Sequence, residues 1–331
     1  MSSGRTVKLY TGQEIPAVGL GTWQSKPSEV RLAVTEALRI GYRHIDAAAT
    51  YDNEEEVGAG IRDSGVPRSS IWLTSKLWNT HHLPEDVERA VDKTLEDLGT
   101  DYLDLYLMHW PVSFKKSEEN EWIRNPIDPE TGAVAVSDVP ITDTWKAMEE
   151  MVRKGKVRAI GVSNFTREKT EEILKIAEIK PALSQFEAHP YFQQTELIDW
   201  LKSQDIAVAV YSPSGNNVYG RPRAVDDPEI LSIASELGVE PNQLLVQWAV
   251  QRGTIALPKS VTPSRIKVNF QDFEVPAEAV ERINKLDRNQ RNNFPSRLGV
   301  DIFGEVKDEE VLKRGVREWV EKQKALKAQK A

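Results

Sequence analysis

The chain has 331 residues, of which 40% are hydrophobic and 28% are charged, and it contains no cysteine. The absence of cysteine excludes disulfides, thiolate nucleophiles and cysteine-bound metals. The net charge of −8 argues against a nucleic acid or an anionic membrane as the main partner. Residues 1–16 lack the apolar core of a signal peptide, and no apolar run is long enough to span a bilayer, so we expect a soluble cytoplasmic protein.

Short β-branched runs alternate with amphipathic helical segments along the chain. The segments VKL and IPAV, joined by a TGQE turn, predict a leading β-hairpin. In the first helical segment, apolar residues recur with helical spacing from Val30 to Leu38, with Ser28 as candidate N-cap and Gly41 placed to end the helix. Similar patterns predict helices at 84–98, 143–154, 166–177, 195–203, 228–237 and 242–251.

Eight candidate strands read GLGTW, RHIDAA, IWLTSK, LDLYLMH, VRAIGVS, ALSQFE, IAVAVYS and TIALPKS. Eight βα units predict a (β/α)8 TIM barrel as a single domain over 1–331, with a C-terminal loop and helix extension whose tail, about 305–331, is peripheral. The alternative is a doubly wound open sheet, whose first strand usually precedes a G-x-G-x-x-G turn, and the nearest match at 19–24 lacks the third glycine. The polar insertion 111–140 is expected beside the mouth of the barrel.

Four polar residues sit at or just beyond predicted strand ends: Asp46, Tyr51, Lys76 and His109. Working residues of an α/β barrel lie at the C-terminal ends of its strands, so we expect these four side chains to converge. A lysine cation beside a phenol should lower the pKa of the phenol, and a carboxylate should hold that lysine charged. This predicts Tyr51 as general acid, Lys76 and Asp46 as tuning groups, and His109 as the residue that orients a carbonyl oxygen. Singly, each has a structural alternative in packing, an ion pair or a buried histidine.

Other strand ends predict a site for the nicotinamide of a cofactor. Tyr211 offers a flat surface on which a nicotinamide could stack. Ser163, Asn164 and Gln185 supply hydrogen-bond donors and acceptors for a carboxamide.

A second group predicts the phosphate end of the same site. Lys259, Ser260 and Arg265 place two cations and a hydroxyl close to an expected helix start. This combination suits a ribose 2′-phosphate, although a solvated basic turn is the alternative interpretation.

Seven segments together resemble the signature blocks of the aldo-keto reductase superfamily: DAAATYDNEEEVG, LTSKLW, LYLMHWP, GVSNF, QFEAHPY, YSP and LPKSVTPSRI. They occur in the family's order over roughly residues 5–300. The resemblance implies a monomeric TIM barrel that reduces aldehydes and ketones with NADPH and without a metal, using the same four residues with Tyr51 as proton donor. It also implies a cofactor site with further members, namely Thr22, Trp23, Asp46, Ser212, Pro213, Ser214, Val261, Thr262 and Asn269.

The chain departs from the family pattern at two places. Val268 stands where many members have an acidic residue before the adenine-contacting asparagine. Ser214-Gly215-Asn216-Asn217 replaces a common Leu-Gly in the loop that encloses the pyrophosphate in relatives. We therefore expect an altered adenine contact and altered cofactor release.

Aromatic residues after strand ends predict an apolar substrate pocket, formed by Trp23, Trp78 and Trp110 together with Tyr51 and His109. Such walls with polar neighbours suit small aldehydes, including sugar-derived ones. The segment NNFPSRLGVDIFGE is similar to fungal-type members that act on glycerol, glyceraldehyde or pentoses.

Two other functions remain open from the sequence. A Schiff-base lyase would use Lys76 as its nucleophile. A non-catalytic, NADPH-binding regulatory subunit would keep the cofactor site alone. His81 and His82 lack an evident third ligand, so we expect no metal site there.

Overall fold

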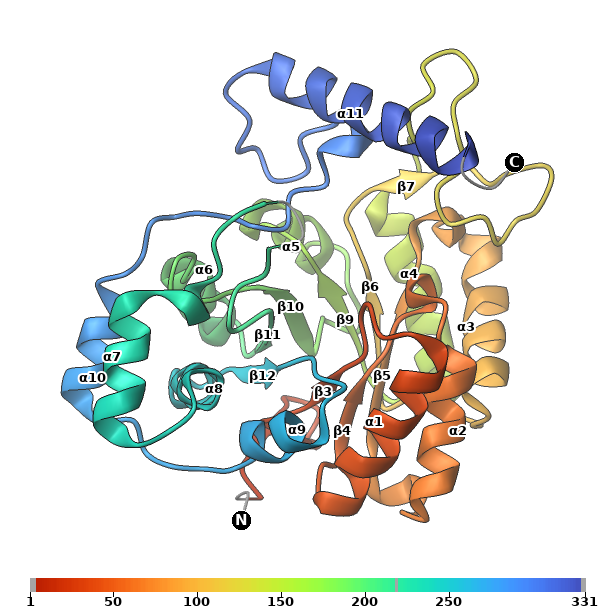
Figure 1. The fold of residues 1–331 in the computed structure, drawn as a ribbon. Coiled ribbons are helices and arrows are strands. Elements are labelled where there is room, and N and C mark those ends of the chain that lie inside the picture. Colours follow the sequence, from red (N-terminus) through yellow and green to blue (C-terminus); the bar gives the residue numbers. More distant parts are fainter. Residues whose placement is uncertain (1–3, 218–219, 329–331) are drawn as a thin grey trace.

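A computed structural model describes residues 4–217 and 220–328 and has at its centre a barrel of eight parallel strands (Figure 1). The strand order is β12-β11-β10-β9-β6-β5-β4-β3, so each strand pairs with the next parallel strand along the chain. Parallel bridges between Val18 and Ala256 and between Gly21 and Lys259 join the two end strands. The predicted TIM barrel is therefore confirmed. The strands are β3 (Leu20–Gly21), β4 (His44–Asp46), β5 (Trp72–Leu77), β6 (Leu105–Met108), β9 (Ile160–Ser163), β10 (Leu183–Glu187), β11 (Ala207–Tyr211) and β12 (Ile255–Leu257).

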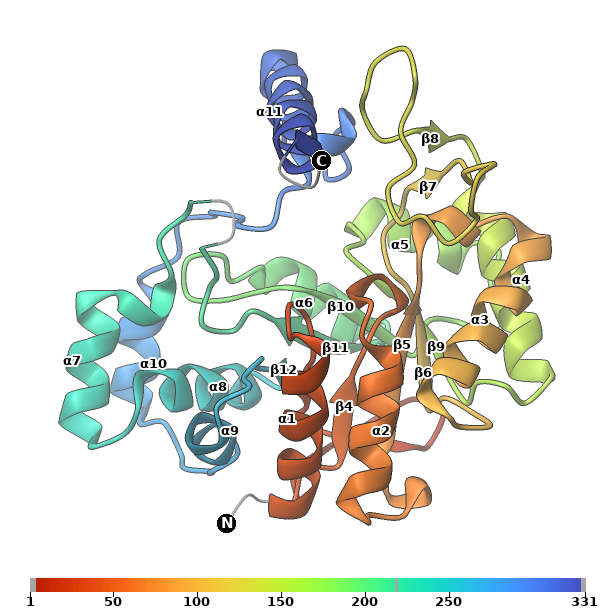
Figure 2. The same ribbon diagram turned by 45° about the vertical axis from the view of Figure 1, so that its right-hand side comes forward.

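Helices surround the barrel, and each barrel strand is followed by one of them (Figures 1 and 2). In the described residues no helix is both long and apolar enough to cross a membrane. The α-helices are α1 (Pro27–Ile40), α2 (Glu54–Ser64), α3 (Pro84–Leu98), α4 (Ile141–Arg153), α5 (Arg167–Leu174), α6 (Thr195–Ser203), α7 (Pro228–Leu237), α8 (Pro241–Gln251), α9 (Pro263–Asn269), α10 (Ala277–Asn284) and α11 (Glu309–Ala328). Short 3₁₀ turns are η1 (Ala49–Tyr51), η2 (Arg68–Ser70), η3 (Asn79–His81), η4 (Ala224–Asp226) and η5 (Ser296–Leu298).

The leading hairpin closes the end of the barrel opposite the site. Its strands β1 (Thr6–Lys8) and β2 (Glu14–Pro16) pair antiparallel, as the sequence predicts. Leu9 and Ile15 belong to the same buried cluster as inward-facing strand residues such as Leu107 and Leu183. The hairpin thus supplies apolar side chains that fill the bottom of the barrel, and the other end stays open for chemistry.

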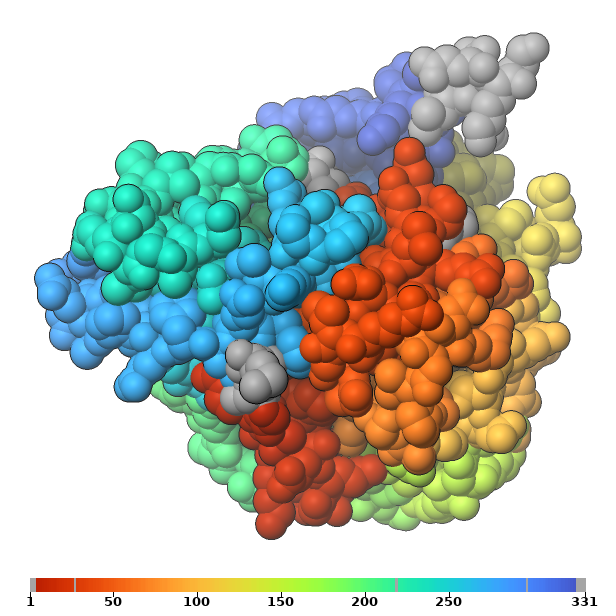
Figure 3. Space-filling view, turned by 60° about the horizontal axis from the view of Figure 1, so that its bottom comes forward, coloured from red at the N-terminus to blue at the C-terminus, as the bar shows by residue number. Residues whose placement is uncertain are grey.

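The first and last parts of the barrel meet side by side. Figure 3 shows the segment around α9 lying against α1, although more than 220 residues separate them in the chain. Tyr42, just after α1, stacks on Phe270 with ring centroids 4.2 Å apart and donates a hydrogen bond to the carbonyl of Ile266. This contact joins the segments of α1 and α9 in the outer layer of helices, beside the place where the two end strands close the barrel.

Two segments outside the regular units lie above the mouth of the barrel (Figure 2). The 111–140 insertion contains a small antiparallel hairpin, β7 (Ser113–Phe114) and β8 (Val136–Ser137). In α11, Trp319 packs against a cluster that includes Trp78 and Trp110. Trp319 of this helix thus contacts the aromatic residues at the mouth, while the peripheral character of the tail stays a prediction.

Most predicted helices are present, and the differences have local causes. The helix α1 begins at Pro27 rather than after Ser28, because proline fits the first helical position and Lys26 becomes the N-cap. Gly41 ends it in the left-handed conformation with φ of 119°. The helices α2 and α10 were not among the predicted helices, and of α9 only the start near Arg265 was expected. Their segments are short or strongly charged, and packing on the barrel stabilises them more than their own periodicity does.

Gly58 provides a test of how α2 packs on the layer beside it. A Cβ at this position would lie 2.2 Å from the carbonyl oxygen of Leu98, at the end of α3. We expect Gly58→Ala to lower the free energy of unfolding by about 1–3 kcal/mol, because backbone has to move. Urea denaturation measures this change. Gly4→Ala is the matched control, since its Cβ would meet nothing within 4 Å. Equal stability of both variants would contradict the close packing.

Candidate active site

A buried ion pair lies at the centre of the predicted site. Asp46 ends β4 and Lys76 lies in the neighbouring strand β5. The Lys76 Nζ donates to Asp46 Oδ1 at 2.6 Å, to the carbonyl of Ala47 at 2.8 Å and to Tyr51 Oη at 3.5 Å. Three oxygen acceptors match the three N–H groups of an ammonium, so this geometry suits the charged form of the lysine.

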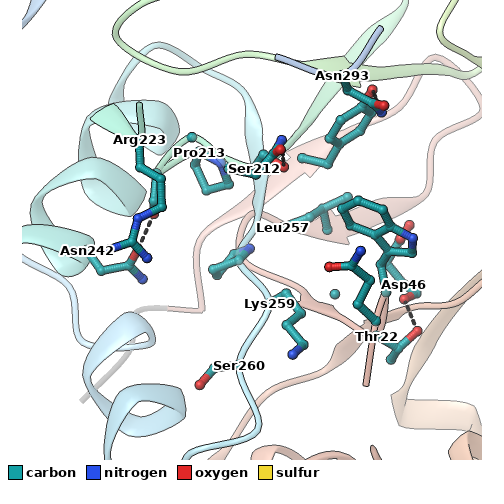
Figure 4. A pocket seen from close by; sticks show the side chains of 18 of the residues that line it. Thr22, Asp46, Ser212, Pro213, Arg223, Asn242, Leu257, Lys259, Ser260 and Asn293 are labelled. Carbon is teal, nitrogen blue, oxygen red and sulfur yellow. Dashed lines mark hydrogen bonds between the residues drawn. The ribbon is translucent and has the colours of Figure 1, made fainter. Parts of the chain in front are cut away.

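The carboxylate of Asp46 is held on both oxygens. Its Oδ2 accepts a hydrogen bond from Gln185 Nε2 at 2.7 Å, and the backbone carbonyl of Asp46 accepts one from Thr22 Oγ1 at 2.9 Å (Figure 4). The side chains of Lys76 and Asp46 are 0% and 5% exposed. Burial lowers the pKa of Lys76, and the nearby Asp46 charge and hydrogen bond oppose that effect.

Tyr51 and His109 lie together beside this pair. Their ring centroids are 5.9 Å apart in an edge-on arrangement, and Trp78 is 5.3 Å from His109 on another side. Burial raises the pKa of Tyr51 well above its usual value, and the Asp46 charge adds to the rise. The expectation of a lowered pKa is therefore wrong, because desolvation of the phenolate is the largest cause of the shift. The raised pKa means that the phenol keeps its proton near neutral pH.

His109 is neutral for a similar reason. Burial lowers the pKa of His109 well below its usual value, and the charges of Lys76 and His82 lower it further. A neutral imidazole still carries one N–H, so it can donate a hydrogen bond to an oxygen without bringing a second positive charge close to Lys76.

A cavity of about 720 Å³ opens at this end of the barrel. Figure 4 shows some of its lining side chains, with Lys259 and Ser260 in the lower part of the view and Asn293 in the upper part. The predicted site residues that line it are Thr22, Trp23, Asp46, Tyr51, Trp78, His109, Trp110, Asn164, Gln185, Tyr211, Ser212, Pro213, Ser214, Lys259, Ser260, Val261, Thr262, Arg265 and Asn269.

Two predicted residues do not line the cavity. Lys76 is fully buried, with its ammonium against Asp46 and the Tyr51 hydroxyl. Ser163 is fully buried at the end of β9, where its Oγ accepts a hydrogen bond from Asn164 Nδ2 at 3.2 Å. Lys76 thus reaches the cavity through the Tyr51 hydroxyl, and Ser163 lies directly behind Asn164, which does line the cavity.

A hydrogen-bonded chain crosses the cavity wall near the aromatic residues. Tyr211 Oη donates to Asn164 Oδ1 at 2.6 Å and accepts from Asn293 Nδ2 at 3.0 Å. Asn164 Nδ2 in turn donates to the carbonyl of His109 at 2.9 Å. This chain fixes the plane of the Tyr211 ring relative to His109.

Backbone strain gathers at the same edge of the barrel. Gln24, Asn164 and Ser212 all line the cavity and have positive φ values of 56°, 62° and 53°. Such conformations are unfavourable for residues other than glycine and persist where the surroundings impose them, frequently at functional sites. Here they turn the chain sharply after strands and aim side chains or backbone groups at the cavity.

The opposite end of the cavity carries positive charge. Among the described residues, no acidic side chain forms an ion pair with Lys259 or Arg265, and both are exposed. Asn242 links the loop after β11 to α9, since it contacts Ser214 and donates to Asn269 Oδ1 at 2.5 Å. In the described part of the chain, no cluster of three or more histidine, aspartate or glutamate side chains could hold a metal ion.

Comparisons with known proteins agree with this arrangement. Residues 17–288 match the family model described as the aldo/keto reductase family. The chain belongs to the aldo/keto reductase family. It is therefore an oxidoreductase by family.

Relatives cover nearly the whole of this aldo/keto reductase. An uncharacterized oxidoreductase of Schizosaccharomyces pombe is 46% identical over 306 residues, which span 91% of this chain and 94% of that protein. Aldo-keto reductase family 1 member A1 of Pongo abelii is 44% identical over 301 residues, or 87% and 91% of the two chains. The solved structure of the aldose reductase from Schistosoma japonicum superposes with a TM-score of 0.84 at 38% identity, covering 92% and 99% of the two chains.

The cavity of this aldo/keto reductase also has lining residues that the sequence did not indicate: Arg223, Asn242, Asn293 and Arg297. Asn293 and Arg297 come from the irregular segment after α10, which has no periodicity from which to place them. Asn242 and Arg223 come from α8 and from the loop before η4, and no local pattern distinguishes them from surface residues. Their place depends on tertiary packing alone.

The buried pair gives a stability prediction. We expect Asp46→Asn to cost about 3 kcal/mol of unfolding free energy near neutral pH, because the Lys76 ammonium loses its counter-ion in a buried site. The substitution lowers the pKa of Lys76 in the folded variant further below its value in the unfolded chain. The unfolded chain therefore binds more protons than the folded one, and the loss of unfolding free energy relative to the parent becomes smaller as pH rises. Thermal and urea unfolding at several pH values measure both effects.

The exposed Arg31–Asp63 pair provides the control. Asp63→Asn makes the same chemical change at the surface, where solvent screens the charges, so its unfolding midpoint should stay close to that of the parent chain. If the two variants lose equal stability, the Lys76–Asp46 pair is not the buried contact that the geometry indicates.

Proposed function

We propose that this chain is an NADPH-dependent reductase of small aldehydes and ketones, acting reversibly, with Tyr51 as the proton donor. One observation carries the proposal: Tyr51 lines the cavity, and its hydroxyl accepts a hydrogen bond from the buried Lys76 ammonium, which is paired with Asp46. A phenol backed by a buried cation can release a proton to an oxygen and leave the resulting phenolate stabilised. The family membership agrees with that chemistry.

The lining residues fit a dinucleotide with a 2′-phosphate. Tyr211, Gln185, Lys259 and Arg265 all line the cavity, and the two cations have no acidic partner among the described residues. The Tyr211 ring and the Gln185 amide would hold the nicotinamide, and the two cations would hold the phosphate. When bound, NADPH supplies the hydride that reduces the carbonyl carbon.

The protein's own contribution is binding, orientation and proton transfer. His109, as a neutral imidazole, donates its N–H to the carbonyl oxygen and directs that oxygen toward the Tyr51 hydroxyl. Tyr51 transfers its proton to the oxygen as negative charge develops there, and the Lys76 ammonium stabilises the phenolate that remains. In the reverse direction the phenolate accepts the proton of an alcohol.

The lining of the substrate end supports small, hydroxylated aldehydes. Trp23, Trp78 and Trp110 give apolar walls, while Asn293 and Arg297 add an amide and a guanidinium. Among the described residues no acidic side chain pairs with Arg297, so its N–H groups are available to oxygen atoms of a substrate. This mixture agrees with sugar-derived aldehydes better than with long apolar ones.

The Schiff-base alternative has less support. A nucleophilic lysine must be neutral and accessible to the substrate. Lys76 has no exposed surface, donates three hydrogen bonds and does not line the cavity. Borohydride treatment in the presence of substrate would trap an adduct on Lys76 only if the lyase mechanism operates.

The first test is Tyr51→Phe, which deletes the proposed proton donor and keeps the ring. We expect the rate of NADPH oxidation with DL-glyceraldehyde, followed at 340 nm, to fall by about 10²–10⁴-fold. Binding of NADPH, measured by fluorescence, should be nearly unchanged. Tyr10→Phe is the control, because that hydroxyl bonds the carbonyl of Lys180 far from the cavity. Equal activity of Tyr51→Phe and the parent would refute the assignment, and binding of NADPH without turnover in the parent would favour a regulatory subunit.

Cofactor preference gives a second test. We expect Arg265→Ala to weaken NADPH binding by about 10–100-fold, because one charge-assisted contact to the phosphate is lost, and to leave NADH binding nearly unchanged. Titration of intrinsic fluorescence with each cofactor measures both values. Lys267→Ala removes an exposed cation of the same helix that does not line the cavity, and it should leave both affinities unchanged. A parallel loss for NADH would argue against a 2′-phosphate contact.

A further inference from the structure

A second buried carboxylate lies behind the proposed catalytic residues, on the far face of β5. Ser75 and Lys76 are consecutive in this strand, so their side chains point to opposite faces. Lys76 reaches Asp46 and Tyr51, and Ser75 Oγ donates to Glu54 Oε1 at 2.5 Å. Glu54, the first residue of α2, is only 5% exposed.

The partners of Glu54 are hydroxyl groups. Besides Ser75, Thr94 Oγ1 in α3 donates to Glu54 Oε2 at 3.3 Å. Among the described residues no lysine, arginine or histidine forms an ion pair with Glu54. A hydroxyl can donate to a carboxylate or accept from a carboxylic acid, so this environment accommodates both protonation states.

A small cavity of about 60 Å³ gives the carboxyl group room for water. Trp78 lines this cavity and the large one, so the two share a wall. Charged and titratable groups facing the small cavity come from α3, η3, β6 and the insertion, and they are Lys93, Asp97, His81, Tyr106 and Arg124.

The charge of Glu54 changes near neutral pH. Burial raises the pKa of Glu54 to about 7, and the Asp97 charge adds to the rise. The Ser75 and Thr94 hydrogen bonds and the Arg124 charge act in the opposite direction. The Glu54 charge in turn favours the charged form of Lys76. A group of this kind therefore changes the field at Lys76 within the working range of most enzymes.

We propose that Glu54 is a positioning residue of the reductase, whose carboxylate acts across β5 on the charge of Lys76 and so on proton transfer at Tyr51. The inference rests on the proposed function. Side chains on opposite faces of one strand place the two charges on either side of β5, with protein between them. At an effective dielectric constant of about 20, a charge about 10 Å away changes a pKa by about one unit.

The direction of the effect follows from the signs of the charges. Ionised Glu54 stabilises the ammonium of Lys76 and disfavours the phenolate of Tyr51, so it favours the proton on the Tyr51–Lys76 pair. Alcohol oxidation needs the phenolate as the base. Removing the Glu54 charge therefore makes the phenolate available at a lower pH. The rate of alcohol oxidation then increases at pH values below the pKa of the Tyr51–Lys76 pair.

The experiment compares Glu54→Gln with the full-length parent in the oxidation of glycerol with NADP⁺ across pH. Glutamine has the same shape and stays neutral. We expect the ratio of kcat/KM, variant over parent, to lie near one at about pH 6, where Glu54 is protonated in the parent. The ratio should rise to about 3–10 by about pH 8.5, where the parent carries the charge. A loss of packing alone would change kcat/KM by the same factor at every pH.

Glu55→Gln is the matched control. It removes the same charge from the next residue of α2, where the side chain is exposed and solvent screens it. Its ratio should stay near one across the pH range. The inference is overturned if folded Glu54→Gln gives a kcat/KM ratio that does not change with pH. It is also overturned if the ratio rises equally in Glu54→Gln and Glu55→Gln. In either case a parent that oxidises glycerol and loses activity on Tyr51→Phe leaves the proposed function intact.

A second variant covers the case in which Glu54→Gln does not fold. Thr94→Val keeps the shape of the side chain and removes one hydrogen bond to the carboxylate, which raises the pKa of Glu54. At pH values between the Glu54 pKa of the parent and that of the variant, the variant should oxidise glycerol faster than the parent. At higher pH the ratio of kcat/KM, variant over parent, should return to one. A ratio that does not change with pH overturns the inference.

Discussion

The site depends on keeping one lysine charged where no water reaches it. A buried ammonium is costly unless a counter-ion and hydrogen-bond acceptors surround it. Asp46 and the carbonyl of Ala47 provide these, and the parallel pairing of β4 with β5 brings both within 2.8 Å of Lys76. Tyr51 then completes the set of acceptors, so the same contacts that make the buried lysine tolerable also orient the phenol.

The closed barrel makes that arrangement possible. Lys76, Asp46 and Gln185 come from three different strands, and Gln185 reaches Asp46 across the barrel from β10. An open sheet would separate those strands. The hairpin side chains Leu9 and Ile15 fill the opposite end, so the polar groups are confined to the mouth. The aromatic cluster with Trp78, Trp110 and Trp319 then sets one wall of the cavity.

Much of this was readable from the chain because strand ends in a parallel barrel share one edge. That rule was enough to place Asp46, Tyr51 and His109 at a common mouth. It did not show that Ser163, which ends its strand, is buried, and it gave the wrong direction for the pKa of Tyr51, since burial cannot be read from sequence. Asn293 and Arg297 were missed because an irregular segment has no period to follow. Glu54 lies within a recognised block, yet its contact with Ser75 depends on how α2 packs on β5.

The sequence by itself determined the alternation of strands and helices, the closed parallel barrel and the membership of the aldo/keto reductase family. These follow from local periodicity and from short motifs, which are properties of neighbouring residues. Only the tertiary structure decided which polar groups are desolvated, which side chains line the cavity and how α11 supports it. Desolvation and long-range contact arise from atoms that are distant in the chain, and so they are fixed only when the barrel closes.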